Sequence, residues 1–322
     1  MTENEFYAYV AENVLEKFPA SYENAEVIIE ERMKNNNRLV HGMTIRREGD
    51  MAMPILYLDD FYQRAKNQEP MKDVLEDIAK QYDLAVRDIG KIEIPDMSRE
   101  SLLENVRCRV IDAKANDRLL QDLVYQDLGC GYAMTVYQNA SIGDRSGMIQ
   151  ITHELAEKAD VSEKELLEKA LSNTEKAERA TFMDITQALF NPSHEPQYLS
   201  DEPYIDPDSN LIVLTSDANP PVYGSTVFFY PETQEKIAEV IGSSYYVLPS
   251  SIHEVLIMPF REEQAMNGPD KERMAHMVKE INETQVAPQE RFGNRVLFYD
   301  KDTKELTVAA DLDQTRTKER DR

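Results

Sequence analysis

The sequence contains few cysteines and glycines, which limits the chemistry open to it. Its 322 residues include two cysteines, Cys108 and Cys130, without CxxC spacing. This usage suits a reducing compartment, argues against a thiolate zinc site and predicts ordinary strand residues at both positions. The eleven glycines form no GxGxxG, GxxxxGK[ST] or GxSxG motif. Nothing local therefore indicates a dinucleotide site, a P-loop or a hydrolase elbow, and no cofactor is expected.

Positive charge is also scarce. The chain has 36 Lys and Arg against 60 Asp and Glu, a formal net charge of -24, and no Lys/Arg-rich run. Phosphate backbones and anionic membranes are repelled at long range, so direct nucleic-acid or membrane binding is not expected. A basic protein partner stays open, including a DNA-binding protein for which this chain would act as a decoy. A solubilising surface is the simpler explanation of the acidity.

Long hydrophobic runs are absent as well. No window approaches the roughly 18 apolar residues of a membrane span. The segment MTENEFYAYVAENVLEKF has acid where a secretory signal needs Lys or Arg, and it lacks the apolar core of such a signal. We therefore expect a cytoplasmic protein. The 41% hydrophobic share is enough to bury one large core or two medium ones.

Residues 1–95 predict a helix-hairpin-helix unit. Thr2 and Glu5 have capping-box spacing and should start a helix that runs to about Phe18. KNNN predicts the turn of a hairpin between AEVIIEERM and RLVHGMTIRRE, because Asn tolerates left-handed backbone angles. A short helix should follow Asp59 or Asp60, and a longer one should begin at Pro70. The segment IEIPDMSRE is expected to be a linker.

The remaining chain predicts a mixed sheet covered by helices. Residues 96–190 contain the strand patterns ENVRCRVIDA, GYAMTVYQ and GMIQIT, followed by a long amphipathic helix. Residues 191–210 hold four prolines and five acids and predict an exposed connector. Residues 211–310 predict a β-α-β-β-α-β unit that packs with 96–190, and 311–322 a frayed tail. Because both faces of LIVLT and YYVLP are apolar, these should be central strands. The predicted class is α+β (mixed α/β).

The stretch LPSSIHEVLIMP raises the question of an active site. Strand alternation places His253 and Glu254 on opposite faces, so they cannot act together. Ser251 would share a face with His253, but residues two apart along a strand are separated by about 7 Å of rise. The stretch therefore predicts a hairpin turn whose serine hydroxyls bond to turn backbone. His253, His153 and His41 remain weak candidates for catalysis.

Three histidines precede glutamate: His153, His194 and His253. A zincin helix needs a second histidine four residues after the first. Those positions hold Glu157, Tyr198 and Ile257. No local metal motif results, and no metal is expected. His153 should lie at the start of a helix with Thr152 as its cap. A site assembled from His41, His153 and His253 across the fold stays open as an alternative.

Two further positions have a possible functional role. His41 lies on the apolar side of its strand, with Leu39, Met43 and Ile45, and is expected to be a core histidine bonded to backbone. Asp59 and Asp60 follow PILYL at a strand end, a usual place for metal-binding acids. The expected role of this pair is to cap the following helix.

Several segments together resemble a known family. They are RLVHGMTIRREGDMAMPILYLDDFYQRAKNQEPMKDVLEDIAKQYD, LIVLTS, YPETQEKIAEVIGSSYYVLPSSIHEVLIMP and EINETQVAPQERFGNRVLFYDKDTKEL. They are similar to an uncharacterised family of anaerobic Gram-positive gut bacteria, domain of unknown function 5688. The last block is also weakly similar to a second uncharacterised family of bacterial cytoplasmic proteins. Neither resemblance implies an activity or site residues.

The sequence leaves three kinds of function open. We expect a non-enzymatic cytoplasmic binding or interaction protein of bacteria, with a protein or a small ligand as its partner. One alternative is a hydrolase with a non-local site of histidine and acid, possibly dependent on a metal. The other is an acidic DNA mimic or decoy.

Overall fold

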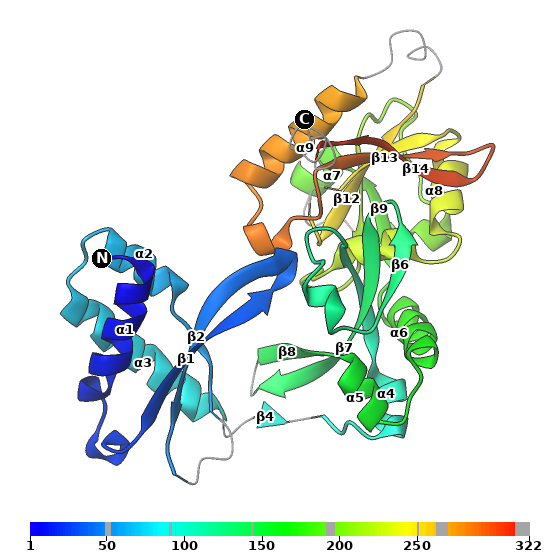
Figure 1. Cartoon of the computed structure of the whole chain (residues 1–322). Coiled ribbons are helices and arrows are strands. Elements are labelled where there is room, and N and C mark those ends of the chain that lie inside the picture. The colour runs from blue at the N-terminus through cyan, green and yellow to red at the C-terminus, as the bar shows by residue number, and fades with distance from the viewer. Residues whose placement is uncertain are drawn as a thin grey trace, which may run out of the picture. The chain divides into compact units, whose positions relative to one another are not determined.

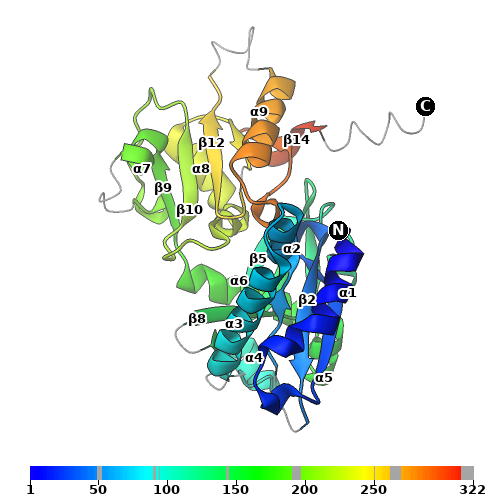
Figure 2. The same cartoon turned by 90° about the vertical axis from the view of Figure 1, so that its left-hand side faces the viewer.

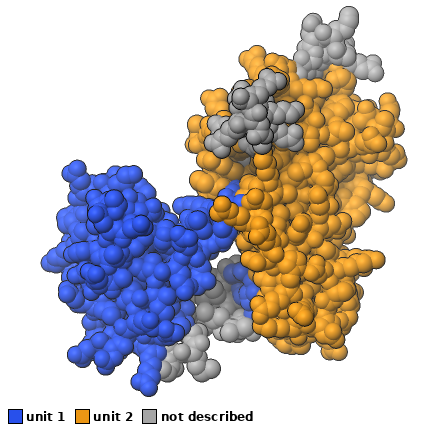
Figure 3. Space-filling view, in the orientation of Figure 1, with its two compact units in different colours: residues 1–95, 139–149 blue, residues 96–138, 150–322 orange. Residues whose placement is uncertain are grey.

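The computed structural model describes residues 1–48, 53–89, 92–93, 95–142, 145–190, 197–249, 251–261 and 270–312. The chain folds into two compact units, residues 1–95 with 139–149, and residues 96–138 with 150–322 (Figure 3). The architecture is α+β, as the sequence predicts. Several predicted features lie outside the described residues: the His194–Glu195 pair, Ser250, the first part of the connector and the tail beyond residue 312.

Unit 1 begins with the predicted capping box. In α1 (Glu3–Asn13), the Thr2 hydroxyl accepts the Glu5 N–H and the Glu5 carboxylate accepts the Thr2 N–H. The hairpin is confirmed, with left-handed backbone at Asn36 in its turn. Its strands are β1 (Glu26–Lys34) and β2 (Arg38–Arg46), and the short β3 (Leu56–Tyr57) pairs with β2. The unit continues with α2 (Asp59–Lys66), α3 (Met71–Ile89) and β4 (Ile92–Glu93).

The core of unit 1 lies between its sheet and its helices (Figure 2). It is formed by the apolar faces of α1, β2 and α3, represented by Phe6, Val10, Met43, Ile45, Val74 and Ile78. Tyr82 of α3 is also buried here, and its hydroxyl accepts the N–H of Ile45 and donates to the carbonyl of the same residue. The two hydrogen bonds of this buried hydroxyl therefore hold β2 in position against α3.

The strand β7 (Tyr132–Ile142) is shared between the two units. Its first part pairs in unit 2 with β5 (Arg107–Asp112) and β6 (Tyr125–Gly129), and its last residues pair in unit 1 with β4. The strand β8 (Arg145–Gln150) also pairs with β7. Unit 2 has three helices beside this sheet, which are α4 (Arg99–Asn105), α5 (His153–Lys158) and α6 (Glu163–Ala177) (Figure 1).

The second sheet of unit 2 has six antiparallel strands in the order β14-β13-β11-β12-β10-β9. Their bounds are β9 (Ala180–Asp184), β10 (Ile212–Ser216), β11 (Tyr245–Leu248), β12 (Glu254–Pro259), β13 (Arg295–Asp300) and β14 (Glu305–Asp311). The associated helices are α7 (Ile185–Phe190), α8 (Thr233–Ile241) and α9 (Lys271–Thr284). β10 and β11 are interior strands, as their apolar faces predict. Within the described residues, no helix combines the length and apolar composition needed to cross a membrane.

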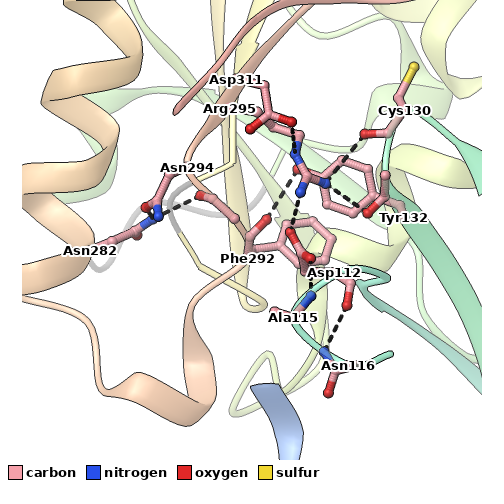
Figure 4. A network of polar contacts seen from close by, with 12 residues as sticks. Asp112, Ala115, Asn116, Cys130, Tyr132, Asn282, Phe292, Asn294, Arg295 and Asp311 are labelled. Atoms are coloured by element: carbon pink, nitrogen blue, oxygen red, sulfur yellow. Dashed lines mark hydrogen bonds and ion pairs between the residues drawn. The ribbon is translucent and has the colours of Figure 1, made fainter. Parts of the chain in front are cut away.

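A buried ion pair joins the two sheets of unit 2 (Figure 4). Arg295 of β13 donates from Nη2 to Oδ2 of Asp112 at 2.6 Å, and both side chains are 1% exposed. Arg295 Nη1 also donates to the carbonyls of Cys130 and Gly131 in the turn before β7. A Cβ atom on Gly131 would overlap the guanidinium, so the turn requires glycine there. Cys130 thus lies in a turn, at φ 51°, whereas a strand was expected.

Candidate functional site

Three potential ligand residues come together in unit 1. Glu3 lies in the first turn of α1, His41 in the middle of β2, and Asp59 at the first position of α2. One ligand atom from each lies within 4.8 Å of the other two. His41 Nδ1 is 3.8 Å from Glu3 Oε1 and 3.8 Å from Asp59 Oδ1. The set therefore combines an imidazole with two carboxylates from three separate elements.

Asp59 is held in place by the backbone of β2. Its Oδ2 accepts the His41 N–H at 2.9 Å, and the Leu58 N–H donates to the His41 carbonyl at 2.9 Å. Oδ1 is left facing the imidazole. Neither Asp59 nor Asp60 caps α2, whose N-cap is Leu58 and has no side-chain cap bond. The expected capping role is thus wrong, because the Asp59 carboxylate bonds to the neighbouring strand instead.

The His41 ring is packed against an aromatic neighbour. Its side chain is 19% exposed and stacks on Tyr7, with ring centroids 4.0 Å apart. Nδ1 is buried and has no hydrogen-bond partner within the described residues. The expected bond from this ring to backbone is therefore not made there. Met43 and Ile45 share its face and are buried, as expected, whereas Leu39 is 42% exposed.

The electrostatics of the cluster favour a cation. The Tyr7 hydroxyl donates to Glu3 Oε1 at 3.0 Å. Burial, this bond and the nearby Asp59 and Glu3 carboxylates raise the pKa of Tyr7, so its hydroxyl stays a neutral donor. Within the described part of the chain, neither Glu3 nor Asp59 forms an ion pair with a lysine or arginine. The negative charge beside Nδ1 is therefore offset by no basic side chain described here.

A fourth acid lies on the other edge of the ring. Glu31 is paired directly with His41 in the hairpin register, and its Oε1 is 3.9 Å from Nε2. Both residues border a hollow of about 390 Å³. Its other lining residues are Asn4, Tyr7, Ala8, Ala11 and Ile29. Of the three cluster residues, His41 therefore borders a space that small molecules can enter.

The geometry is close to that of a metal centre. At zinc bond lengths of about 2.1 Å, two tetrahedral ligand atoms are about 3.4 Å apart. The observed separations of 3.8 Å from Nδ1 exceed this by only a few tenths of an ångström. Imidazole nitrogen and carboxylate oxygen suit zinc, manganese or iron. Small side-chain shifts would therefore complete three positions of such a centre.

His153 occupies a different setting, in unit 2. It is the first residue of α5, and the Thr152 hydroxyl accepts the Leu155 N–H, which confirms the predicted cap. Its Nδ1 is 2.7 Å from Oε1 of Glu163 in an exposed pair. Within the described residues, no cluster of three ligand residues includes His153.

His253 also lies in unit 2, one residue before β12. Its Nε2 is 3.8 Å from Glu290, whereas Glu254 accepts a hydrogen bond from the Ser251 hydroxyl at 2.9 Å. The Ser251 oxygen also accepts the His253 N–H at 3.0 Å, so the serine bonds to turn backbone as predicted. His253 and Glu254 have different partners. Within the described residues, His253 joins no three-ligand cluster either.

The sequence singled out His41 and Asp59 but not the acids beside them. Glu3 has the pattern of an ordinary first-turn helix acid, and nothing local connects it to residues 41 and 59. Glu31 could have been found, because a turn centred on Asn36 pairs residue 31 with residue 41. Glu3 is brought beside His41 and Asp59 by long-range packing, which the sequence pattern does not reveal.

Comparison with known proteins gives one match. The model of a family of unknown function, DUF5688, matches residues 3–301. No curated protein and no solved structure shows a significant match. Because the family match spans most of the 322 residues, the chain belongs to the DUF5688 family, whose function is unknown.

Proposed function

We propose that the protein is a non-enzymatic binding protein that holds a divalent transition-metal ion with Glu3, His41 and Asp59. The observation that carries this proposal is the buried Nδ1 of His41, which has no hydrogen-bond partner in the described residues and faces two carboxylates. A buried polar atom without a partner destabilises a fold, and a cation between these groups would remove that cost. Among common ions, zinc combines high affinity with this ligand set.

Titration of the metal-free full-length protein, without a polyhistidine tag, tests the proposal. We expect one zinc ion per chain, weaker binding of manganese and little binding of magnesium. Glu3→Gln, His41→Gln and Asp59→Asn should each weaken zinc binding at least about tenfold, because each removes a ligand. Glu3→Gln is the mildest change, since that side chain is half-exposed and its amide oxygen can still accept the Tyr7 hydroxyl.

The matched control is His153→Gln, which removes a histidine that faces a single glutamate. Zinc affinity should be unchanged in this variant. Thermal unfolding of each metal-free variant would show whether the fold is retained. Zinc binding that is absent from the wild type, or that is as tight in all three ligand variants as in the wild type, would refute the proposal.

The cellular setting is part of the same proposal. We place the protein in the cytoplasm of bacteria, and both free cysteines, Cys108 and Cys130, support a reducing compartment. The net charge of -24 supports a partner other than nucleic acid. Cell fractionation followed by immunodetection tests the location, and recovery in the membrane fraction would contradict it.

A metal-dependent hydrolase is the second candidate, favoured by the hollow beside His41. Three protein ligands leave coordination positions for water, which is the arrangement of catalytic zinc sites. Metal-loaded protein should then hydrolyse a member of a phosphate-ester, carboxyl-ester and peptide panel. Chelation and Asp59→Asn should both abolish that turnover. Absence of turnover with bound zinc would support the binding role alone.

A further inference from the structure

A second cavity lies wholly within unit 2. It has a volume of about 240 Å³ and lies where the end of α6, the start of β9 and the start of α8 meet. The lining residues are Glu175, Glu178, Arg179, Ala180, Leu199, Ser200, Tyr230, Pro231, Glu232, Thr233 and Lys236. Pockets for drug-sized ligands have about 300–1,000 Å³, so this cavity suits a smaller molecule.

One side of the cavity is acidic. Glu175 and Glu178 lie at the end of α6, and burial raises the pKa of both carboxyl groups. Within the described residues, neither forms an ion pair with a lysine or arginine. Tyr230 is 8% exposed, and its hydroxyl has no hydrogen-bond partner within the described residues. Burial is the main cause of the raised pKa of Tyr230, and the charge of Glu178 contributes next.

The start of α8 has two features that suit an anion, beside the acidic lining residue Glu232. Helix α8 starts at Thr233, and its N-cap Glu232 makes no side-chain cap bond, so the first N–H groups have no side-chain acceptor from the cap. Lys236 lies one turn later, and its Nζ contacts the Ser200 carbonyl at 3.4 Å. Within the described residues Lys236 forms no ion pair. Arg179, by contrast, is paired with Asp201 and lies over the Tyr198 ring.

We propose that this cavity binds a free α-amino acid. Its ammonium group would lie against Glu175, Glu178 and the Tyr230 hydroxyl. Its carboxylate would lie at the start of α8 beside Lys236. A purely anionic ligand would meet Glu175, Glu178 and Glu232, and a purely cationic ligand would leave Lys236 and the helix N-terminus unmatched. A zwitterion of small size satisfies both sides.

Calorimetric titration of the full chain with each of the protein amino acids tests this proposal. The amino acid that binds best is then compared with its N-acetyl derivative and with the amine that lacks the carboxylate. Each derivative loses one of the two charges, and each should bind at least about tenfold more weakly, a free-energy difference of about 1.4 kcal/mol.

Variants test the placement of the ligand. Tyr230→Phe, Glu178→Gln and Lys236→Met should each weaken amino-acid binding at least about tenfold. Tyr299→Phe is the matched control, because Tyr299 is buried in the same unit and does not line the cavity. This control should bind as the wild type does. Thermal unfolding confirms that Tyr230→Phe, which removes a single oxygen atom, keeps its fold.

Three results would overturn the proposal. These are no heat of binding with any amino acid at about 10 mM, equal binding of the derivatives, and unchanged affinity in Tyr230→Phe. The outcome is independent of the metal site. Glu3→Gln, in metal-free protein, should retain full amino-acid binding, so failure of one proposal is distinguishable from failure of the other.

Discussion

The residue Arg295 shows how the stability of unit 2 depends on buried charge, because it pairs with both Asp112 and Asp311. Arg295 reaches from one sheet to the turn and strand end of the other, and Tyr132 lies beneath its guanidinium. The Ala115 N–H also donates to Asp112 Oδ1, so the carboxylate has a second partner. In a site this dry, removing Arg295 takes a buried positive charge away from both Asp112 and Asp311.

Arg295→Met should therefore lower the free energy of unfolding by about 3–5 kcal/mol. Replacing both charges, as in Asp112→Leu with Arg295→Met, should cost less than the sum of the single changes, because each single change already removes the Arg295–Asp112 interaction. Urea unfolding of the two single variants and the double variant measures this difference. Additive effects would contradict the prediction.

Glu178 gives a prediction on pH. Since burial raises the pKa of Glu178 in the folded state, folding favours its protonated form. The resulting stabilisation is fully present below the unfolded pKa of about 4.3 and is lost as pH rises through the folded value. Glu178→Gln cannot ionise. The free energy of unfolding of Glu178→Gln minus that of the wild type should therefore increase with pH over this window. Urea unfolding at several pH values measures it, and a constant difference would contradict it.

At the level of elements, local signals predicted most helices and most strands, but α4, α7 and some strands were missed. The capping box of Thr2 and Glu5, the Asn turn and the apolar runs LIVLT and YYVLP indicated correct elements because their causes are local. β6 was missed because its residues are mostly exposed and lack alternation. β9 was missed because it is short, with α7 starting directly after it, and its pairing with β10 is not evident in the sequence.

The cap of α6 supplies a prediction on element stability. The Ser162 hydroxyl accepts the Glu165 N–H, so Ser162→Ala should lower the free energy of unfolding by about 1 kcal/mol. Ser98 is the matched control, because it is the N-cap of α4 but its side chain makes no cap bond. Ser98→Ala should have a clearly smaller effect. Equal losses, measured by urea unfolding, would contradict the role of the cap.

For the whole molecule, the class of fold could be predicted from the sequence, but the candidate sites could not. His41 and Asp59 were noticed separately because each stands at an unusual place in a pattern. Their meeting with Glu3 depends on how α1 and α2 pack beside β2, which involves residues 38 and 56 positions apart. The cavity of unit 2 was missed because its carboxylates occur at the end of a helix already rich in Glu and Lys.

Zinc should change the stability of the molecule unevenly. An ion that binds the folded state at about 100 times its dissociation constant stabilises that state by about 2.7 kcal/mol. Amide hydrogen exchange should therefore slow most in α1, β2 and the start of α2, which carry the ligands. Glu3→Gln should greatly reduce this protection. Equal slowing in α9 of unit 2, or none anywhere, would contradict the site.

The double use of the Asp59 carboxylate affects which ions could be held. Asp59 Oδ2 accepts a hydrogen bond from the backbone of β2, and the His41 ring stacks on Tyr7. These two metal-ligand side chains therefore have little conformational freedom. Glu3 is half-exposed and can adjust. The range of ionic radii that the site can bind would then depend on the Glu3 side chain. Glu3→Asp shortens this side chain and should weaken the binding of small ions more than that of large ions.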